Sequence, residues 1–131
     1  MKLLLIDDDD DDVLFFSDAL RSKYPHVVIE RFRSGIEALT SMRNEGIANV
    51  DIIFLDVNLP ALNGWECLRE IKAVAGWQKV PIVMYSTANL FNTGVQPADV
   101  GAAAFYTKSD SFEDLIDSIG QALQMVFAKG G

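Results

Sequence analysis

Residues 51–64 read DIIFLDVNLPALNG, and this stretch decides the fold. Residues 52–55 are continuously apolar and too few for a helix, so they predict a strand that is buried on both faces. Asp56 follows directly, and Asn58, Pro60 and Gly64 are typical of a loop that opens a new helix. A carboxylate is therefore expected at the carboxyl end of a central parallel strand, where reacting groups collect in open α/β sheets. On this stretch alone, Asp56 could equally end a strand and accept loop hydrogen bonds.

The composition is that of one cytoplasmic domain with its own apolar core. The chain has 131 residues, of which 50% are hydrophobic, so it can fold without a metal or a disulfide. Cys67 is the single cysteine, which suits a reducing compartment. No apolar run approaches the length of a signal sequence or a membrane span. The net charge of -8, with scattered Lys and Arg, argues against direct binding of nucleic acid.

Strand-like and helix-like segments alternate five times along the chain. Strands are predicted at residues 2–6, 27–32, 52–55, 81–86 and 102–107. Ser34 with Glu37, and Asn63 with Glu66, have the spacing of capping boxes at helix starts, and Ser111 is placed to cap the last helix. This alternation predicts a doubly wound, right-handed parallel sheet that is covered by helices on both faces.

The fourth connection departs from that alternation. Gly94 and Pro97 stand where the fourth helix is expected, and proline is strongly unfavourable inside a helix. Pro97 at a first helical position, with Gly101 just past the end, suits only a short helix at residues 97–100. We therefore expect a disrupted fourth helix, with residues 89–96 forming a loop or one distorted turn.

Six consecutive aspartates, at positions 7–12, follow the first strand. The last four are explained by helix capping and by the helix dipole. Asp7 and Asp8 lie instead at the end of the strand itself, next to the expected position of Asp56. Three carboxylates at one sheet edge predict a hard-oxygen site suited to Mg²⁺. The run also resembles a calcium loop, but Asp12 and Asp18 occupy positions that require Gly and Glu, which argues against that interpretation.

Two further polar residues end strands at the same predicted edge. Ser86 ends the fourth strand and Lys108 follows the fifth. Each alone is usually a cap or a solvated strand end. Together with the aspartates they supply a carboxylate nucleophile, metal ligands, a hydroxyl and an ammonium. A carboxylate can attack phosphorus to form an acyl phosphate, a reaction that needs positioning and charge neutralisation.

These motifs together resemble the receiver domain of two-component response regulators, and the chain is similar to the single-domain chemotaxis regulator. The resemblance covers nearly the whole chain and rests on IDD at 6–8, FLDVNLP at 54–60, PIVMYS at 81–86 and GAAAFYTK at 101–108. It implies a flavodoxin-like fold with five parallel strands in the order 2-1-3-4-5. It also implies one receiver domain over residues 1–131 with no output domain.

The resemblance assigns roles to the residues at the sheet edge. Asp56 would accept a phosphoryl group from a phosphohistidine on a sensor histidine kinase or a histidine phosphotransfer protein. Asp8, Asp56 and the carbonyl of Asn58 would ligate Mg²⁺, with Asp7 acting through water. The output would be contact with a separate downstream protein. Catalysis would be limited to self-phosphorylation and self-dephosphorylation, so the chain would not be an enzyme.

The resemblance also implies a conformational switch. Ser86 and Lys108 would hold phosphoryl oxygens, and the Ser86 hydroxyl would move together with the aromatic Phe105. Locally, Phe105 is more simply a core residue. Because Phe has no hydroxyl that needs a partner, we expect its inward rotamer to cost little. Asn58 and Ala88 lie where the family tunes the lifetime of the phosphoryl group.

Two departures from the family pattern keep other interpretations open. Ser109 replaces a proline that the family holds in a cis peptide, so the peptide is either trans, with Lys108 aimed differently, or strained. The disrupted fourth helix makes the usual partner surface unsafe to assume. An unphosphorylated receiver-like scaffold is therefore one alternative. A Mg²⁺-dependent phosphohydrolase fits less well because Asn58 replaces the usual acid, and an FMN carrier would need a Ser/Thr-rich loop after the first strand.

Overall fold

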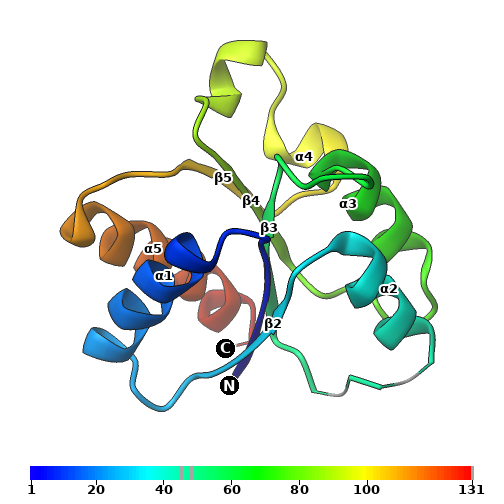
Figure 1. Ribbon diagram of the computed structural model, residues 1–131, viewed down its shortest axis with the longest axis horizontal. Helices are drawn as coiled ribbons and strands as arrows, with labels where there is room; N and C mark the ends of the chain where they lie inside the picture. Colours follow the sequence, from blue (N-terminus) through cyan, green and yellow to red (C-terminus); the bar gives the residue numbers. More distant parts are fainter. Residues whose placement is uncertain (45, 48, 131) are drawn as a thin grey trace.

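The computed structural model has one five-stranded sheet with strand order β2-β1-β3-β4-β5 (Figure 1). Every pairing is parallel, which confirms the predicted fold class and strand order. The structure describes residues 1–44, 46–47 and 49–130, and all their side chains except those of residues 91 and 126–130. The strands are β1 (Lys2–Ile6), β2 (Val28–Phe32), β3 (Ile52–Asp56), β4 (Ile82–Ser86) and β5 (Ala104–Thr107). The helices are α1 (Asp10–Lys23), α2 (Gly35–Arg43), α3 (Gly64–Ala73), α4 (Pro97–Val100) and α5 (Phe112–Gly130), with a 3₁₀ turn η1 (Leu90–Thr93) before α4.

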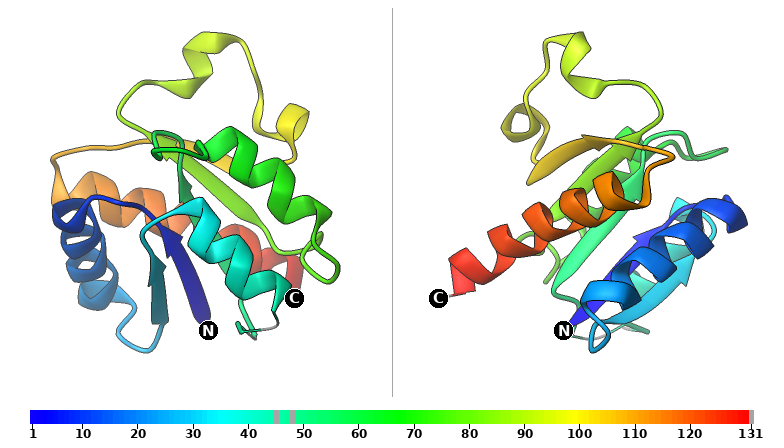
Figure 2. Two further views of the ribbon diagram at one scale, coloured as in Figure 1. Left: turned by 45° about the vertical axis from the view of Figure 1, so that its right-hand side comes forward. Right: turned by 90° about the vertical axis from the view of Figure 1, so that its left-hand side faces the viewer.

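Helices cover both faces of the sheet, as Figures 1 and 2 show. Successive residues of a strand point to opposite faces, so each strand contributes to two apolar cores. Leu55 and Met84 pack with α2 and α3, whereas Phe54 and Val83 pack with α1 and α5. All five residues of β3 are buried. The apolar run at residues 52–55 is therefore explained by burial on both sides.

All three predicted helix starts carry the expected cap, but at Ser34 the second bond of the capping box is absent. Asn63 and Glu66 form both bonds of a capping box at α3, and Ser111 Oγ accepts a bond from Asp114 at α5. Ser34 caps α2 by accepting from the Glu37 amide. The Glu37 carboxylate, however, accepts from the Arg33 amide, so the return bond of that box falls one residue earlier.

The connection between β4 and β5 has the expected irregular form. Residues 90–93 make the single 3₁₀ turn η1, and α4 has four residues and ends at Gly101 with φ of 82°. Figure 2 shows η1 projecting beyond the carboxyl edge of the sheet. Strand β5 begins at Ala104 instead of the predicted residue 102, because the Ala102 amide donates to the Pro97 carbonyl and belongs to the end of α4. No helix in the described part of the chain is long and apolar enough to cross a membrane.

Candidate functional site

The carboxyl edge of the sheet brings together the predicted polar residues from four strand ends. Asp7 follows β1 directly and Asp56 ends β3. Ser86 ends β4, and Lys108 follows β5. All three of Asp7, Asp56 and Ser86 are buried. Because parallel strands align their carboxyl ends, residues separated by up to 101 positions in sequence come within contact distance of one another.

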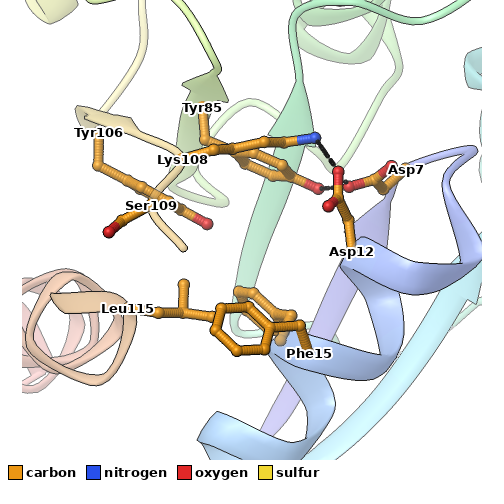
Figure 3. A pocket seen from close by; sticks show the side chains of 9 residues that line it. Asp7, Asp12, Phe15, Tyr85, Tyr106, Lys108, Ser109 and Leu115 are labelled. Atoms are coloured by element: carbon orange, nitrogen blue, oxygen red, sulfur yellow. Dashed lines mark hydrogen bonds and ion pairs between the residues drawn. The ribbon is translucent and has the colours of Figure 1, made fainter. Parts of the chain in front are cut away.

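Lys108 lies at the centre of this group. Its Nζ is 2.6 Å from Asp12 Oδ2, 3.0 Å from Asp56 Oδ2 and 3.4 Å from Asp7 Oδ2, and Figure 3 shows its approach to Asp12. Burial by itself lowers the pKa of Lys108, but the surrounding carboxylates outweigh burial and raise this pKa above its usual value. Lys108 therefore remains an ammonium ion at any physiological pH.

Three aspartates form a potential metal site beside this ammonium. Asp7, Asp8 and Asp56 each offer a carboxylate oxygen, and these oxygens all lie within 4.8 Å of one another. Burial raises the pKa of Asp7 even though the Asp9 amide and the Tyr85 hydroxyl bond to its carboxylate. Asp7, Asp12 and Asp56 lie around the Lys108 ammonium, and Asp8 adds a fourth carboxylate beside Asp7 and Asp56, so the group carries excess negative charge. This set of hard oxygen donors fits Mg²⁺.

Asp56 and Ser86 are linked through Asn58. The Asn58 amide donates to Asp56 Oδ1 at 2.9 Å, and Lys108 occupies the other carboxylate oxygen. Asn58 Nδ2 donates to Ser86 Oγ at 3.1 Å, and the Ala88 amide donates to the same hydroxyl at 3.2 Å. The structure therefore brings both predicted lifetime-tuning residues, Asn58 and Ala88, into contact with the hydroxyl or the acceptor carboxylate.

Phe105 is buried on the face of the sheet that α3 covers. Its side chain is 7% exposed, and its ring meets Trp65 edge to face at a centroid distance of 5.7 Å. The Phe105 side chain therefore lies in the core, and the low cost of its inward rotamer stays a prediction. The ring lies on the opposite side of the sheet from the core of α1 and α5.

The peptide bond after Lys108 is trans, since no cis peptide occurs among the described residues. The Lys108 amide donates to the Ser86 carbonyl at 2.7 Å, which fixes the backbone between β5 and the neighbouring strand end. Ser109 in a trans peptide therefore still leaves the Lys108 ammonium within bonding distance of Asp56.

The aspartate run has more partners than capping alone supplies. Asp9 caps α1 by accepting from the amides of Asp11 and Asp12, as expected. Asp10 also pairs with Arg31 and Arg33 at 2.9 and 3.0 Å. Asp12 pairs with Lys108, a contact that could not be predicted from the sequence because it depends on how α1 is rotated about its axis.

Sequence reasoning also missed Tyr85. Its hydroxyl donates to Asp7 Oδ2 at 2.7 Å, and its ring lies below the Lys108 ammonium with 5.0 Å between the nitrogen and the ring centroid. Tyr85 lies inside an apolar strand, where a tyrosine is ordinarily a core residue. The only available signal was its position next to Ser86, at the reactive end of β4.

The architecture and the site match one family. The sequence profile of the response regulator receiver domain matches residues 3–120, and the chain belongs to this family of two-component signalling modules. Response regulator Rcp1 of Synechocystis sp. is 26% identical over 91 residues, which cover 66% of this chain and 62% of Rcp1. Protein PilH of Pseudomonas aeruginosa is 25% identical over 105 residues, covering 80% of this chain and 84% of PilH. The chain spans only 15% of the transcriptional regulator NtrC of Bradyrhizobium sp., which is 30% identical over 73 residues.

Solved structures share the fold over almost the whole chain. The phosphorylated cyanobacterial phytochrome response regulator RcpA superposes with a TM-score of 0.80 at 23% identity, covering 98% of this chain and 94% of RcpA. Chemotaxis response regulator CheY4 of Vibrio cholerae has a TM-score of 0.76 at 26% identity, covering 95% of this chain and 97% of CheY4. The Mn²⁺-bound form of Rcp1 also has a TM-score of 0.76, at 24% identity, covering 90% of this chain and 88% of Rcp1.

Proposed function

We propose that this receiver accepts a phosphoryl group on Asp56 from a phosphohistidine of a sensor histidine kinase or a histidine phosphotransfer protein. One observation carries the proposal. The buried Asp56 carboxylate lies 3.0 Å from the Lys108 ammonium and shares a cluster of three carboxylates that could hold a divalent cation. A nucleophile, a fixed positive charge and oxygen ligands for a metal are the parts that phosphoryl transfer requires.

In the transfer step, an Asp56 carboxylate oxygen attacks phosphorus and forms the acyl phosphate bond. The bond between phosphorus and the donor imidazole nitrogen breaks, and its electron pair leaves with that nitrogen, which then takes up a proton. Lys108 is placed to neutralise charge on the phosphoryl oxygens. The Ser86 hydroxyl, which accepts hydrogen bonds from Asn58 and Ala88, would be a second donor to these oxygens.

Mg²⁺ is the cofactor that the carboxylate cluster suits, with Asp8, Asp56 and the Asn58 carbonyl as its proposed ligands and Asp7 acting through water. When bound, Mg²⁺ supplies positive charge that offsets the charge of the transferring phosphoryl group. Two relatives support this assignment. RcpA was crystallised in a phosphorylated form, and Rcp1 in a form that binds Mn²⁺.

The phosphorylated state would be read by a separate protein. We propose that the receiver acts in the cytoplasm, and that the signal passes by protein contact and not by direct binding of nucleic acid or membrane. Ser86 and Phe105 would form the switch, and Asn58 and Ala88 would tune the phosphoryl lifetime. Their contacts with the acceptor carboxylate, the hydroxyl and Trp65 support these roles.

The deciding experiment is intact mass spectrometry after incubation with phosphoramidate and Mg²⁺. We expect the wild type to gain one phosphoryl group only when metal is present, and Asp56→Asn to gain none. An unmodified wild type that still binds Mg²⁺ would favour the alternative, an unphosphorylated scaffold. Continuous release of phosphate from added phosphate esters would favour the phosphohydrolase instead, a function that Asn58 at the position of the usual acid argues against.

A further inference from the structure

Tyr85 is a buried polar residue that the proposed mechanism leaves without a role. Its side chain is 3% exposed and lies in the core beneath α1 and α5, one residue before the end of β4. Figure 3 shows its hydroxyl directed at Asp7, where it donates to Oδ2 at 2.7 Å. A tyrosine that only filled the core would not need to place its hydroxyl on a metal-site carboxylate.

The Tyr85 hydroxyl completes the orientation of Asp7. Asp7 Oδ1 already accepts from the Asp9 amide at 2.9 Å, and Oδ2 accepts from Tyr85 at 2.7 Å and from Lys108 at the longer distance of 3.4 Å. Asp7 is 1% exposed, and few water molecules can replace a missing donor at such a site. The short bond from Tyr85 therefore helps to hold the carboxylate in its orientation beside Asp8 and Asp56.

The same hydroxyl limits competition for Lys108. Lys108 Nζ lies 3.4 Å from Asp7 Oδ2, the oxygen that Tyr85 occupies, but 3.0 Å from Asp56 Oδ2. A charged donor is drawn most strongly to a carboxylate that lacks other donors. By satisfying Asp7, Tyr85 leaves the ammonium nearer to the acceptor carboxylate.

The ring of Tyr85 supports Lys108 from below. The ammonium lies 5.0 Å from the ring centroid, within the range of a cation–π interaction. The Tyr85 ring stacks on Tyr106, with 5.2 Å between centroids and 14° between planes. A small cavity of about 30 Å³, lined in part by these two rings and Lys108, lies beside this contact. The ring therefore occupies a defined position under a side chain that is otherwise long and flexible.

We propose that Tyr85 is a positioning residue for the phosphoryl-transfer site, acting through Asp7 with its hydroxyl and through Lys108 with its ring. The inference rests on the proposed function of this site and adds a residue to it. Hydrogen-bonding groups behind metal ligands commonly change metal affinity or activity by about 10- to 100-fold when they are removed.

The two actions of Tyr85 can be separated by two substitutions. Tyr85→Phe removes the hydroxyl and keeps the ring, so we expect the dissociation constant for Mg²⁺ to rise about tenfold. Tyr85→Leu removes both groups. It should weaken Mg²⁺ binding similarly and also lower the maximal phosphorylation rate about tenfold, because Lys108 loses its support.

The test combines metal binding with kinetics. Mg²⁺ alone is titrated into each protein and followed by amide chemical shifts, and initial rates with phosphoramidate are measured across Mg²⁺ concentrations. Tyr106→Phe is the matched control. It removes the same hydroxyl from the stacked neighbour, and within the described part of the chain that hydroxyl makes no bond to Asp7. Unfolding midpoints establish that each variant is folded.

The expected result is weaker Mg²⁺ binding in Tyr85→Phe, wild-type binding in Tyr106→Phe, and a lower maximal rate in Tyr85→Leu than in Tyr85→Phe. Unchanged Mg²⁺ affinity in a folded Tyr85→Phe protein, or an equal loss in Tyr106→Phe, overturns the positioning role. Those results leave the proposed function standing if the wild type is still phosphorylated. A wild type that binds Mg²⁺ but takes no phosphoryl group overturns the proposed function, while the metal titration still decides the part played by the Tyr85 hydroxyl.

Discussion

Phe105 and Trp65 form an aromatic pair on the face of the sheet that α3 covers. The two rings meet edge to face in the core that α3 covers, at an angle of 77°. Such pairs contribute about 0.5–1.5 kcal/mol beyond the burial of their area. Burial of a phenylalanine at this position leaves no polar group of its side chain without a hydrogen bond.

Substitution of Phe105 by tyrosine tests that preference. A hydroxyl placed in the buried site needs a partner, and an unsatisfied one costs about 1–3 kcal/mol. We expect Phe105→Tyr either to lower the free energy of unfolding by about this amount or to turn the ring outward. Trp65 emission, measured in a Trp77→Phe background, reports which occurs. Wild-type stability together with unchanged emission would show that the site accepts a hydroxyl freely.

The placement of individual residues could be predicted only where strand ends determine it. Asp7, Asp56 and Lys108 each follow an apolar run, and parallel strands bring such positions together. Tyr85 could not be assigned, because the same apolar run makes a tyrosine appear to be core. Its role became visible only from the 2.7 Å contact with Asp7.

At the scale of elements, the start of α1 is fastened to β2. Arg31 and Arg33 both pair with Asp10, and Arg31 Nε donates to the Asp7 carbonyl at 3.0 Å. The bond from Arg31, followed by the charge of Arg33, holds the pKa of Asp10 below its usual value of 3.8. The edge strand therefore steadies the loop that carries the metal-site aspartates.

This fastening predicts a particular dependence on pH. A lowered pKa means that the Asp10 carboxylate stabilises the fold above pH 3.8, and that this contribution is lost as pH falls through the lowered value. We expect Asp10→Asn to be less stable than the wild type at about pH 6, and the difference to shrink towards about pH 3. Urea unfolding at both pH values measures the difference in the free energy of unfolding between the two proteins. Asp11→Asn is the control, because Asp11 shares the first turn of α1 but makes no ion pair within the described residues. An equal loss in that variant would assign the effect to the helix dipole.

A second element-scale prediction concerns the close approach of α3 to the end of β3. A Cβ atom at Gly64 would lie 2.6 Å from Val57 Cα, and backbone cannot move aside as the end of a side chain can. We expect Gly64→Ala to cost about 1–3 kcal/mol and to slow phosphorylation by displacing Asp56. Gly120→Ala is the control, since its Cβ would meet only the Tyr24 hydroxyl and alanine favours the helix. Wild-type stability in Gly64→Ala would contradict this account.

Elements were predictable where local chemistry decides them. Gly94 and Pro97 correctly predicted the irregular fourth connection, and Asn63 with Glu66 correctly predicted the start of α3. The start of β5 was predicted two residues early because Ala102 and Ala103 have no property that separates a helix end from a strand. The hydrogen bond from the Ala102 amide to the Pro97 carbonyl assigns Ala102 to the end of α4 and not to β5. That bond depends on how the chain turns at Gly101.

For the molecule as a whole, the cluster of carboxylates should link metal binding to stability. Repulsion among Asp7, Asp8 and Asp56 is relieved when a divalent cation binds the folded state. At a Mg²⁺ concentration ten times the dissociation constant, the free energy of unfolding should rise by about 1.4 kcal/mol. Thermal or urea unfolding with Mg²⁺, compared with NaCl of equal ionic strength, measures this gain. An equal gain in Asp8→Asn would mean that the cation binds elsewhere.

The order of the strands in the sheet could not be predicted from the pattern of the sequence alone. Hydrophobic alternation predicts a doubly wound parallel sheet, but the order 2-1-3-4-5 followed from resemblance to a family. Periodicity describes each strand alone, whereas the order depends on which crossover passes over which face. The two cores, one with α1 and α5 and the other with α2 and α3, are the outcome of those crossovers.

Cys67 makes this molecule convenient for attaching optical reporters. It is the single cysteine, and it is buried. Burial raises the pKa of its thiol to about 12, so thiol-directed dyes will react with it only slowly. Lys79 is exposed and precedes β4, at the amino end of the sheet and away from Asp56. A dye attached at Lys79→Cys would therefore lie away from Asp56 and leave phosphorylation unaffected. Binding of a partner protein could then be followed by single-molecule fluorescence.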